Sequence, residues 1–208
     1  MSDYSAKLEH RQYVGISGSG KTSLMLEHIA APAVCRFIFD PTGQFADRLK
    51  RRPVTTAREV EQALPSGWVV LFPGVMFPGD EETAFRWFCH FAFTASRRGR
   101  GRKILVADEI WQYCSAHKLP RELATVVQMG RVEGLVLMAA TQTPHKIPDP
   151  IWGQTTDCFC FQLTGKLSLE YLEKMEFDLS QLPKHPFQYV HFDPRRPVTF
   201  KRGVSRKC

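Results

Sequence analysis

Short apolar runs recur along the chain, separated by segments of mixed polarity. The runs are rich in Val, Ile, Leu and Phe, and several are apolar at nearly every position. They predict strands at 11–16, 34–39, 67–72, 104–107, 134–140, 157–163 and 187–192. Because continuous apolar runs are typical of strands buried on both faces, the pattern favours a mostly parallel central sheet.

Several segments between these runs carry helical patterns. We expect helices at 21–31, 55–64, 81–96, 120–130 and 168–175. Strands that alternate with helices indicate the α/β class, in which helices flank the sheet. Ligands on such sheets bind beyond the carboxyl ends of the strands, so we expect the functional site at those ends.

The length and the charge of the chain refine this picture. Its 208 residues include 28 Lys and Arg against 21 Asp and Glu, which gives a net charge of +7. This length fits one domain, assigned here to 1–193, followed by a basic tail at 194–208 that could form a disordered, polyanion-binding arm. The positive excess points towards a polyanion such as nucleic acid as the partner.

Six cysteines are scattered along the sequence without the spacing of a metal site or a redox motif. We interpret them as free, mostly buried thiols in a reducing compartment. Cys158 and Cys160 alternate within a predicted strand, so both should face the same side of the sheet. The amino-terminal residues have no apolar signal core, and no apolar run approaches ~18 residues, so we expect neither secretion nor a transmembrane anchor.

The first predicted strand runs directly into GISGSGKT at 15–22, a complete phosphate-binding P-loop. Its glycines let backbone N–H groups turn towards phosphate oxygens, and the following helix adds the positive end of its dipole. Lys21 would reach the β- and γ-phosphates of ATP, and Thr22 would ligate Mg²⁺. The residues expected to contact the nucleotide are Gly15, Ser17, Gly18, Ser19, Gly20, Lys21, Thr22 and Ser23.

The apolar strand at 104–107 ends at an acidic pair, Asp108 and Glu109. This is the Walker B arrangement, in which Asp108 would hold Mg²⁺ and Glu109 would orient and polarise the attacking water. Hydrolysis needs such a base beside the γ-phosphate, whereas a kinase needs a site for an acceptor. Together with the P-loop, the pair predicts an ATPase.

Two further residues near the ends of a buried strand are candidates for the same chemistry. Gln142 follows the strand at 134–140 and would sense the γ-phosphate by hydrogen bonding. Arg131 precedes that strand and is a candidate for the arginine that stabilises the charge developing in phosphoryl transfer, a group often supplied by a neighbouring subunit. Four other arginines compete for this role: Arg97, Arg98, Arg100 and Arg102.

The segment 97–103 places five positive charges in seven residues just before the Walker B strand. It enters that strand at its amino end, which in a parallel sheet is opposite the nucleotide. Its charged residues are candidates for contact with DNA phosphates: Arg97, Arg98, Arg100, Arg102 and Lys103. Such contacts would be independent of base sequence and sensitive to salt. A solvated connector, or a contact with a capsid or a neighbouring subunit, remains open.

Four segments together resemble the HerA/FtsK superfamily of P-loop ATPases. They are GISGSGKTS, FIFDPTGQF, ILVADEIW and GRVEGLVLMAATQTP, and the match spans residues 11–165. The P-loop alone is shared by many families, but an Asp-Glu pair followed by a strand that ends in Ala-Thr-Gln-x-Pro is far more specific. The small size is most similar to the genome-packaging ATPases of membrane-containing icosahedral viruses.

This resemblance implies a RecA-like core, a ring oligomer that is usually a hexamer, and ATP-driven movement of double-stranded DNA. It also implies that Gln142 is the polar sensor and that an arginine near Arg131 acts on the nucleotide of a neighbouring subunit. The expected cofactors are ATP and Mg²⁺, and the expected partners include capsid or virion-vertex proteins. The implied location is the packaging vertex of the virion and the host cytoplasm.

Two other functions remain open from the sequence. A nucleotide or small-molecule kinase would also suit a P-loop and this length, and the segment 97–103 could imitate its arginine-rich lid. The second open function is a virion assembly component that binds nucleotide without turnover. Asp108, Glu109 and Gln142 fit hydrolysis better than they fit a kinase.

Overall fold

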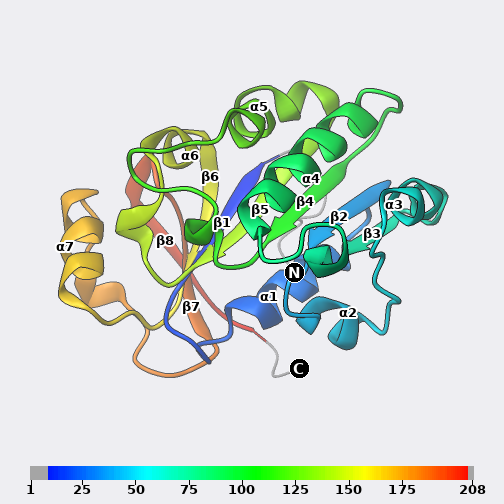
Figure 1. Cartoon of the computed structure of the whole chain (residues 1–208). Coiled ribbons are helices and arrows are strands. Elements are labelled where there is room, and N and C mark those ends of the chain that lie inside the picture. Colours follow the sequence, from blue (N-terminus) through cyan, green and yellow to red (C-terminus); the bar gives the residue numbers. More distant parts are fainter. Residues whose placement is uncertain (1–8, 206–208) are drawn as a thin grey trace.

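The computed structural model describes residues 9–205, which form one eight-stranded sheet with helices on both faces (Figure 1). The strands are β1 (His10–Val14), β2 (Cys35–Phe39), β3 (Trp68–Leu71), β4 (Lys103–Ala107), β5 (Leu135–Thr141), β6 (Thr155–Cys160), β7 (Gln188–Asp193) and β8 (Arg196–Val204). Their order in the sheet is β3-β2-β4-β5-β1-β6-β7-β8. The first six strands pair in parallel, and β7 and β8 add an antiparallel hairpin at one edge. The predicted α/β class with a mostly parallel sheet is confirmed.

The helices are α1 (Lys21–Ile29), α2 (Gln44–Leu49), α3 (Ala57–Ala63), α4 (Glu81–Ser96), α5 (Arg121–Met129), α6 (Asp149–Gln154) and α7 (Lys166–Lys174). The helix predicted at 81–96 has these same bounds because its start is strongly marked. The side chain of Asp80 accepts a hydrogen bond from the Thr83 N–H at 3.0 Å, and two glutamates follow in the first turn. No helix within residues 9–205 is long and apolar enough to cross a lipid bilayer.

Each face of the sheet has its own apolar core. On one face, α1 packs Leu24 and Met25 against strand residues such as Met138. The opposite face is covered by α4, α5, α6 and α7, and its core includes Phe39 and Phe85, whose ring centroids lie 5.2 Å apart. Burial on both faces explains why the strands β3, β4 and β5 are nearly continuous apolar runs. The two layers hold the strand ends, and therefore the site at the carboxyl edge, in fixed positions.

The cysteines within the described residues are free and buried, as predicted. Cys158 and Cys160 both belong to the core under α6 and α7, so they face one side of the sheet. Burial raises the pKa of the Cys160 thiol to about 12, which keeps it protonated at neutral pH. Cys208 lies outside the described residues.

The sequence did not indicate α2, α6 or β8. The two helices have only six residues each, too few for an apolar period to emerge. The suggested disordered arm at 194–208 is wrong for residues 196–204, because they pair with β7 as the edge strand β8. That strand carries charged residues and a proline in its sequence, as edge strands commonly do, and so it lacks the apolar signal of the inner strands. Arg206 and Lys207 lie outside the described residues.

Candidate active site

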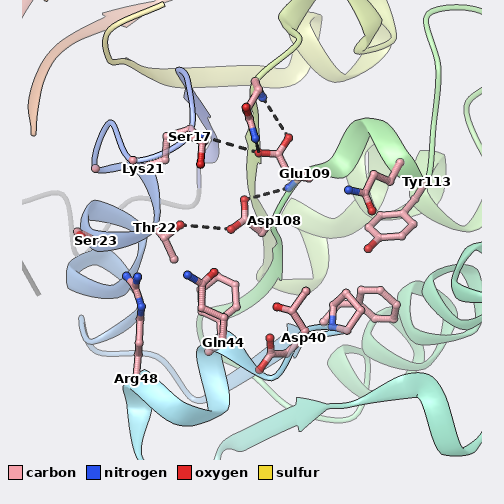
Figure 2. Close-up of a pocket in the computed structure, with 18 of the residues that line it drawn as sticks. Ser17, Lys21, Thr22, Ser23, Asp40, Gln44, Arg48, Asp108, Glu109 and Tyr113 are labelled. Carbon is pink, nitrogen blue, oxygen red and sulfur yellow. Dashed lines mark hydrogen bonds and ion pairs between the residues drawn. The ribbon is translucent and has the colours of Figure 1, made fainter. Parts of the chain in front are cut away.

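The P-loop, the acidic pair and Gln142 meet at the carboxyl edge of three neighbouring strands. The P-loop connects β1 to α1, the acidic pair follows β4, and Gln142 follows β5, the strand that lies between them. A cavity of about 370 Å³ opens at this edge (Figure 2). Six of the eight predicted P-loop contacts line it: Ser17, Gly18, Gly20, Lys21, Thr22 and Ser23. The sheet therefore brings together three segments that are far apart in the sequence, the P-loop at 15–22, the pair at 108–109 and Gln142.

The P-loop is fixed to the strands on either side of it. The N–H of Gly15 donates to the carbonyl of Thr141 at 3.1 Å, and the N–H of Ile16 donates to the carbonyl of Gln162 at 2.9 Å. A Cβ at Gly15 would lie 2.7 Å from the Cβ of Phe161, so no larger residue fits there. The Ser19 hydroxyl donates to the carbonyl of Ile16 at 2.7 Å, inside the loop. Gly15 and Ser19 thus shape the loop from within.

Lys21 lies beneath the loop and is only 6% exposed. Its Nζ donates to the carbonyls of Gly15 at 2.8 Å and Ile16 at 3.0 Å, and lies 3.8 Å from Oε1 of Glu109. Burial lowers the pKa of Lys21, while the carboxylates of Glu109 and Asp108 oppose that shift. These carboxylates favour the charged amine, which is the form that would bind phosphate.

Thr22 and Asp108 form a pair of oxygen donors beside the loop. The hydroxyl of Thr22 donates to Oδ2 of Asp108 at 3.3 Å, and Oδ1 of Asp108 accepts from the N–H of Glu109 at 3.0 Å (Figure 2). Burial raises the pKa of Asp108, and the Glu109 carboxylate adds to this, while Lys21 opposes it. A hydroxyl and a carboxylate are hard oxygen ligands, and Mg²⁺ in phosphate-binding sites takes few protein ligands. The donor set therefore fits Mg²⁺.

Glu109 is held by three donors. Its Oε1 accepts from Gln142 Nε2 at 2.9 Å, and its Oε2 accepts from the Gln142 N–H at 3.2 Å and from Trp111 Nε1 at 2.7 Å. The backbone of Glu109 is left-handed, with φ of 46°, which is unfavourable for a residue with a side chain. Strain of this kind persists where the surroundings fix a functional side chain. The predicted neighbourhood of Glu109 and Gln142 is therefore present, with Trp111 as a partner that the motifs did not indicate.

Helix α2 supplies a further wall of the cavity. Asp40, at the end of β2, is 1% exposed and accepts from the Ala46 N–H at 2.8 Å, which fixes the start of this helix. Burial raises the pKa of Asp40, although hydrogen bonds from the backbone N–H groups at the start of α2 oppose the shift. Gln44 and Arg48 extend from α2 towards the first turn of α1 (Figure 2). Sequence reasoning missed both residues because α2 itself was not predicted.

Arg131 does not reach the nucleotide site of its own chain. It lies in a 3₁₀ turn, η4 (Gly130–Glu133), at the amino end of β5, and its guanidinium donates to Oε1 of Gln154. The P-loop lies at the carboxyl edge of the same sheet. Arg131 instead shares a hollow of about 640 Å³ with the segment 97–102. A role at the nucleotide of a neighbouring subunit stays a prediction.

The predicted DNA contact at Lys103 is wrong. It is 3% exposed, and its Nζ donates to the carbonyls of Ser96 and Glu133, each at 2.9 Å, and of Gly99. These bonds tie the end of α4 to the start of β4 and occupy the amine. Lys103 therefore holds the fold together and is not available to a phosphate backbone.

The other residues of the basic segment differ in exposure. Arg102 is half-buried, its guanidinium donates to the Pro32 carbonyl at 3.5 Å, and burial lowers its pKa to about 10. The remaining three arginines are exposed, and they are called here the arginine surface: Arg97, Arg98 and Arg100. This surface lies at the amino edge of the sheet, as the sequence predicted.

The sheet order, the P-loop and the acidic pair at its carboxyl edge define the fold of a P-loop NTPase. The chain is similar to the genome-packaging NTPase B204 of Sulfolobus turreted icosahedral virus 2, with a TM-score of 0.74 and 15% identity over 96% of this chain and 97% of that chain. The same viral NTPase has been solved in complex with ATP-gammaS, and in that form the TM-score is 0.72. The predicted resemblance to genome-packaging ATPases of icosahedral viruses is therefore confirmed at the level of the fold.

Other comparisons agree with this class. Protein P9 of Pseudoalteromonas phage PM2 is 24% identical over 200 residues, which cover 92% of this chain and 89% of that protein. The conjugation coupling protein TcpA of pCW3 has a TM-score of 0.58 at 14% identity, over 96% of this chain and 60% of that chain. No protein-family model matches the chain.

Proposed function

We propose that this protein is an ATP-hydrolysing motor that moves double-stranded DNA and packages a viral genome into a preformed capsid. The observation that carries the proposal is the convergence of Lys21, Thr22, Asp108, Glu109 and Gln142 on one cavity at the end of a P-loop. The similarity to a genome-packaging NTPase over nearly the whole of both chains supports the packaging role.

The residues have distinct parts in binding. Backbone N–H groups of the P-loop and the amine of Lys21 would bind the β- and γ-phosphates. Thr22 and Asp108 would hold Mg²⁺, which would neutralise charge on the phosphate oxygens when it is bound. A phosphate oxygen between these groups would replace the carbonyls of Gly15 and Ile16 as acceptors for the Lys21 amine.

Glu109 would act as the base in hydrolysis. Its carboxylate lies 3.8 Å from the Lys21 amine, at the end of the cavity where the γ-phosphate would be bound. There it would accept the proton of the attacking water. Gln142 donates to the same carboxylate at 2.9 Å, so a γ-phosphate that attracts Gln142 would also change the hydrogen bonding of the base. This link gives the polar sensor a direct effect on the catalytic group.

The test is ATP turnover by the assembled ring with and without double-stranded DNA. We expect measurable hydrolysis that DNA accelerates, together with ATP-dependent movement of DNA. Transfer of phosphate to a small acceptor in preference to water would favour a kinase. Tight ATP binding without turnover in the assembled ring would favour a structural virion component.

Arg131 is expected to act on the nucleotide of a neighbouring subunit. The Arg131→Ala variant should bind ATP normally but lose about 10³-fold in kcat, since an arginine of this kind stabilises only the transition state. The decisive measurement mixes this variant with Glu109→Gln before assembly. Each is inactive alone, but a Glu109→Gln subunit can offer its intact Arg131 to a neighbour that keeps Glu109, so the mixture should regain activity. Absence of recovery, or loss of ATP binding, would contradict the role in trans.

The arginine surface is proposed to contact DNA phosphates. Replacing Arg98 and Arg100 together with Ala should weaken DNA binding and reduce the slope of log K against log salt by roughly 0.9 for each contact removed. The matched control replaces Arg52 and Arg58, which are also exposed but lie just before α3 and within it. Salt titrations by fluorescence anisotropy compare the pairs. Equal losses in both variants would mean that only net charge matters.

The assembly is part of the same proposal. We propose a homo-oligomeric ring, a hexamer, that contacts capsid or virion-vertex proteins and works at the packaging vertex of the virion and in the host cytoplasm. The arginine surface and the nucleotide cavity lie at opposite edges of the sheet. A ring subunit could therefore present one edge to its neighbour or to DNA while binding ATP at the other.

A further inference from the structure

Phe187 joins the carboxyl-terminal hairpin to the P-loop. It lies immediately before β7, and its N–H donates to the carbonyl of Ser19 at 2.7 Å. Its own carbonyl accepts from the N–H of Ser205, just after β8, at 2.8 Å. Both ends of the hairpin are thus fastened to the phosphate-binding loop through one residue. These bonds use only the backbone of Phe187, and its side chain takes no part in them.

The ring of Phe187 lies against the P-loop at Gly20. A Cβ at Gly20 would be 2.8 Å from Oγ of Ser205 and 3.0 Å from both Cα and Cδ1 of Phe187, and the backbone there has a φ of 109°, so both the space and the backbone favour glycine. Gly20 directly precedes Lys21, so the ring stands next to the residue that would bind the phosphates. Phe187 also has a left-handed backbone, with φ of 66°, and such strain is found where a side chain is held for a function.

The cavity has one partly open aromatic ring within the described residues. Phe39, Phe45 and Tyr113 also line it, but they are 1%, 1% and 3% exposed because they belong to the apolar cores. Phe187 lines the same cavity and is only half-buried. Phe39, Phe45 and Tyr113 pack within the two apolar cores, whereas Phe187 belongs to neither core.

The cavity lining combines two kinds of chemistry. Lys21, Glu109 and Gln142 form a charged and polar group, which suits a triphosphate and an attacking water. An open aromatic ring suits the flat face of a nucleobase, because stacking on an aromatic side chain contributes favourable free energy for every base. We propose that Phe187 is the residue on which the nucleoside part of the bound nucleotide packs. This inference rests on the proposed nucleotide-binding function and adds how the nucleoside is bound.

The test separates the nucleoside from the phosphates. Affinities for ATP and for inorganic tripolyphosphate, each with Mg²⁺, are measured on the full chain for the wild type, Phe187→Ala and Phe187→Tyr. We expect Phe187→Ala to lose about tenfold in ATP affinity and to keep its affinity for tripolyphosphate. Phe187→Tyr retains a ring and should bind both ligands as the wild type does. In turnover, the loss should appear in KM more than in kcat.

Each other outcome overturns the inference. Equal weakening for both ligands in Phe187→Ala would mean that the ring only shapes the P-loop, and unchanged affinity for both would mean that it has no role in binding. Thermal unfolding of each variant shows whether the hydrogen bonds from the Phe187 backbone to Ser19 and Ser205 are preserved. A wild-type protein that binds neither ligand would overturn the proposed function itself, and this inference with it.

Discussion

The Glu109→Gln variant should lose about 10²- to 10⁴-fold in kcat for ATP hydrolysis, the range that removal of a general base typically produces. ATP affinity should change little, because Glu109 would accept a proton from water and would not bind the phosphates. Steady-state turnover and equilibrium binding of ATP measure the two effects separately. DNA movement should stop with hydrolysis.

A matched control variant separates a loss of catalysis from a loss of stability. Glutamine at 109 has an amide group that would face the donors of Gln142 or Trp111, so a modest fall in melting temperature is expected. Glu133→Gln makes the same chemical change at the amino edge of the sheet and should leave turnover unchanged. DNA movement that continues unchanged in Glu109→Gln would refute the proposed mechanism.

Removing the amine of Lys21 should abolish use of the nucleotide. The Lys21→Ala variant is expected to lose ~10³-fold or more in kcat/KM, because the amine would bind phosphate in the ground state and stabilise further charge in the transition state. Both ATP binding and turnover should fall, unlike in Glu109→Gln, where only turnover falls. Isothermal titration and a phosphate-release assay distinguish the two patterns.

The control for this variant is another buried lysine. The amines of Lys21 and Lys103 each donate to backbone carbonyls, so both alanine variants lose comparable structural hydrogen bonds. Lys103→Ala should be less stable to heat, yet the folded fraction should bind ATP normally because Lys103 lies at the opposite edge of the sheet. Similar losses of ATP affinity in both variants would show that Lys21 acts only through stability.

Much of the fold and of the phosphate end of the site was predictable from local sequence. Strands β4 and β5 are apolar at nearly every position because both faces are covered, and that signal is visible without knowledge of the partners. The P-loop and the acidic pair are contiguous motifs at strand ends. In a parallel sheet, the carboxyl ends meet at one edge, so the meeting of Lys21, Asp108 and Gln142 followed once the strands were assigned.

The other parts of the site depend on contacts between distant segments. Phe187 lies against Gly20 only because the β7–β8 hairpin returns to the P-loop, and no spacing in the sequence encodes that return. Lys103 looked like the last charge of a basic run, whereas carbonyls from α4, from the loop after it and from η4 surround its amine. The composition of a segment gives its charge, but tertiary structure decides which of those charges water or a partner can reach.

The attachment of the hairpin to the P-loop has a thermodynamic consequence for assembly. Strand β8 is at the edge of the sheet, and Ser205 at its end is hydrogen-bonded to the same residue that holds Ser19. Any protein that captures this edge and shifts the hairpin would change the affinity for nucleotide. Linkage requires the reverse as well: ATP would then change the affinity of that protein for the edge by the same factor.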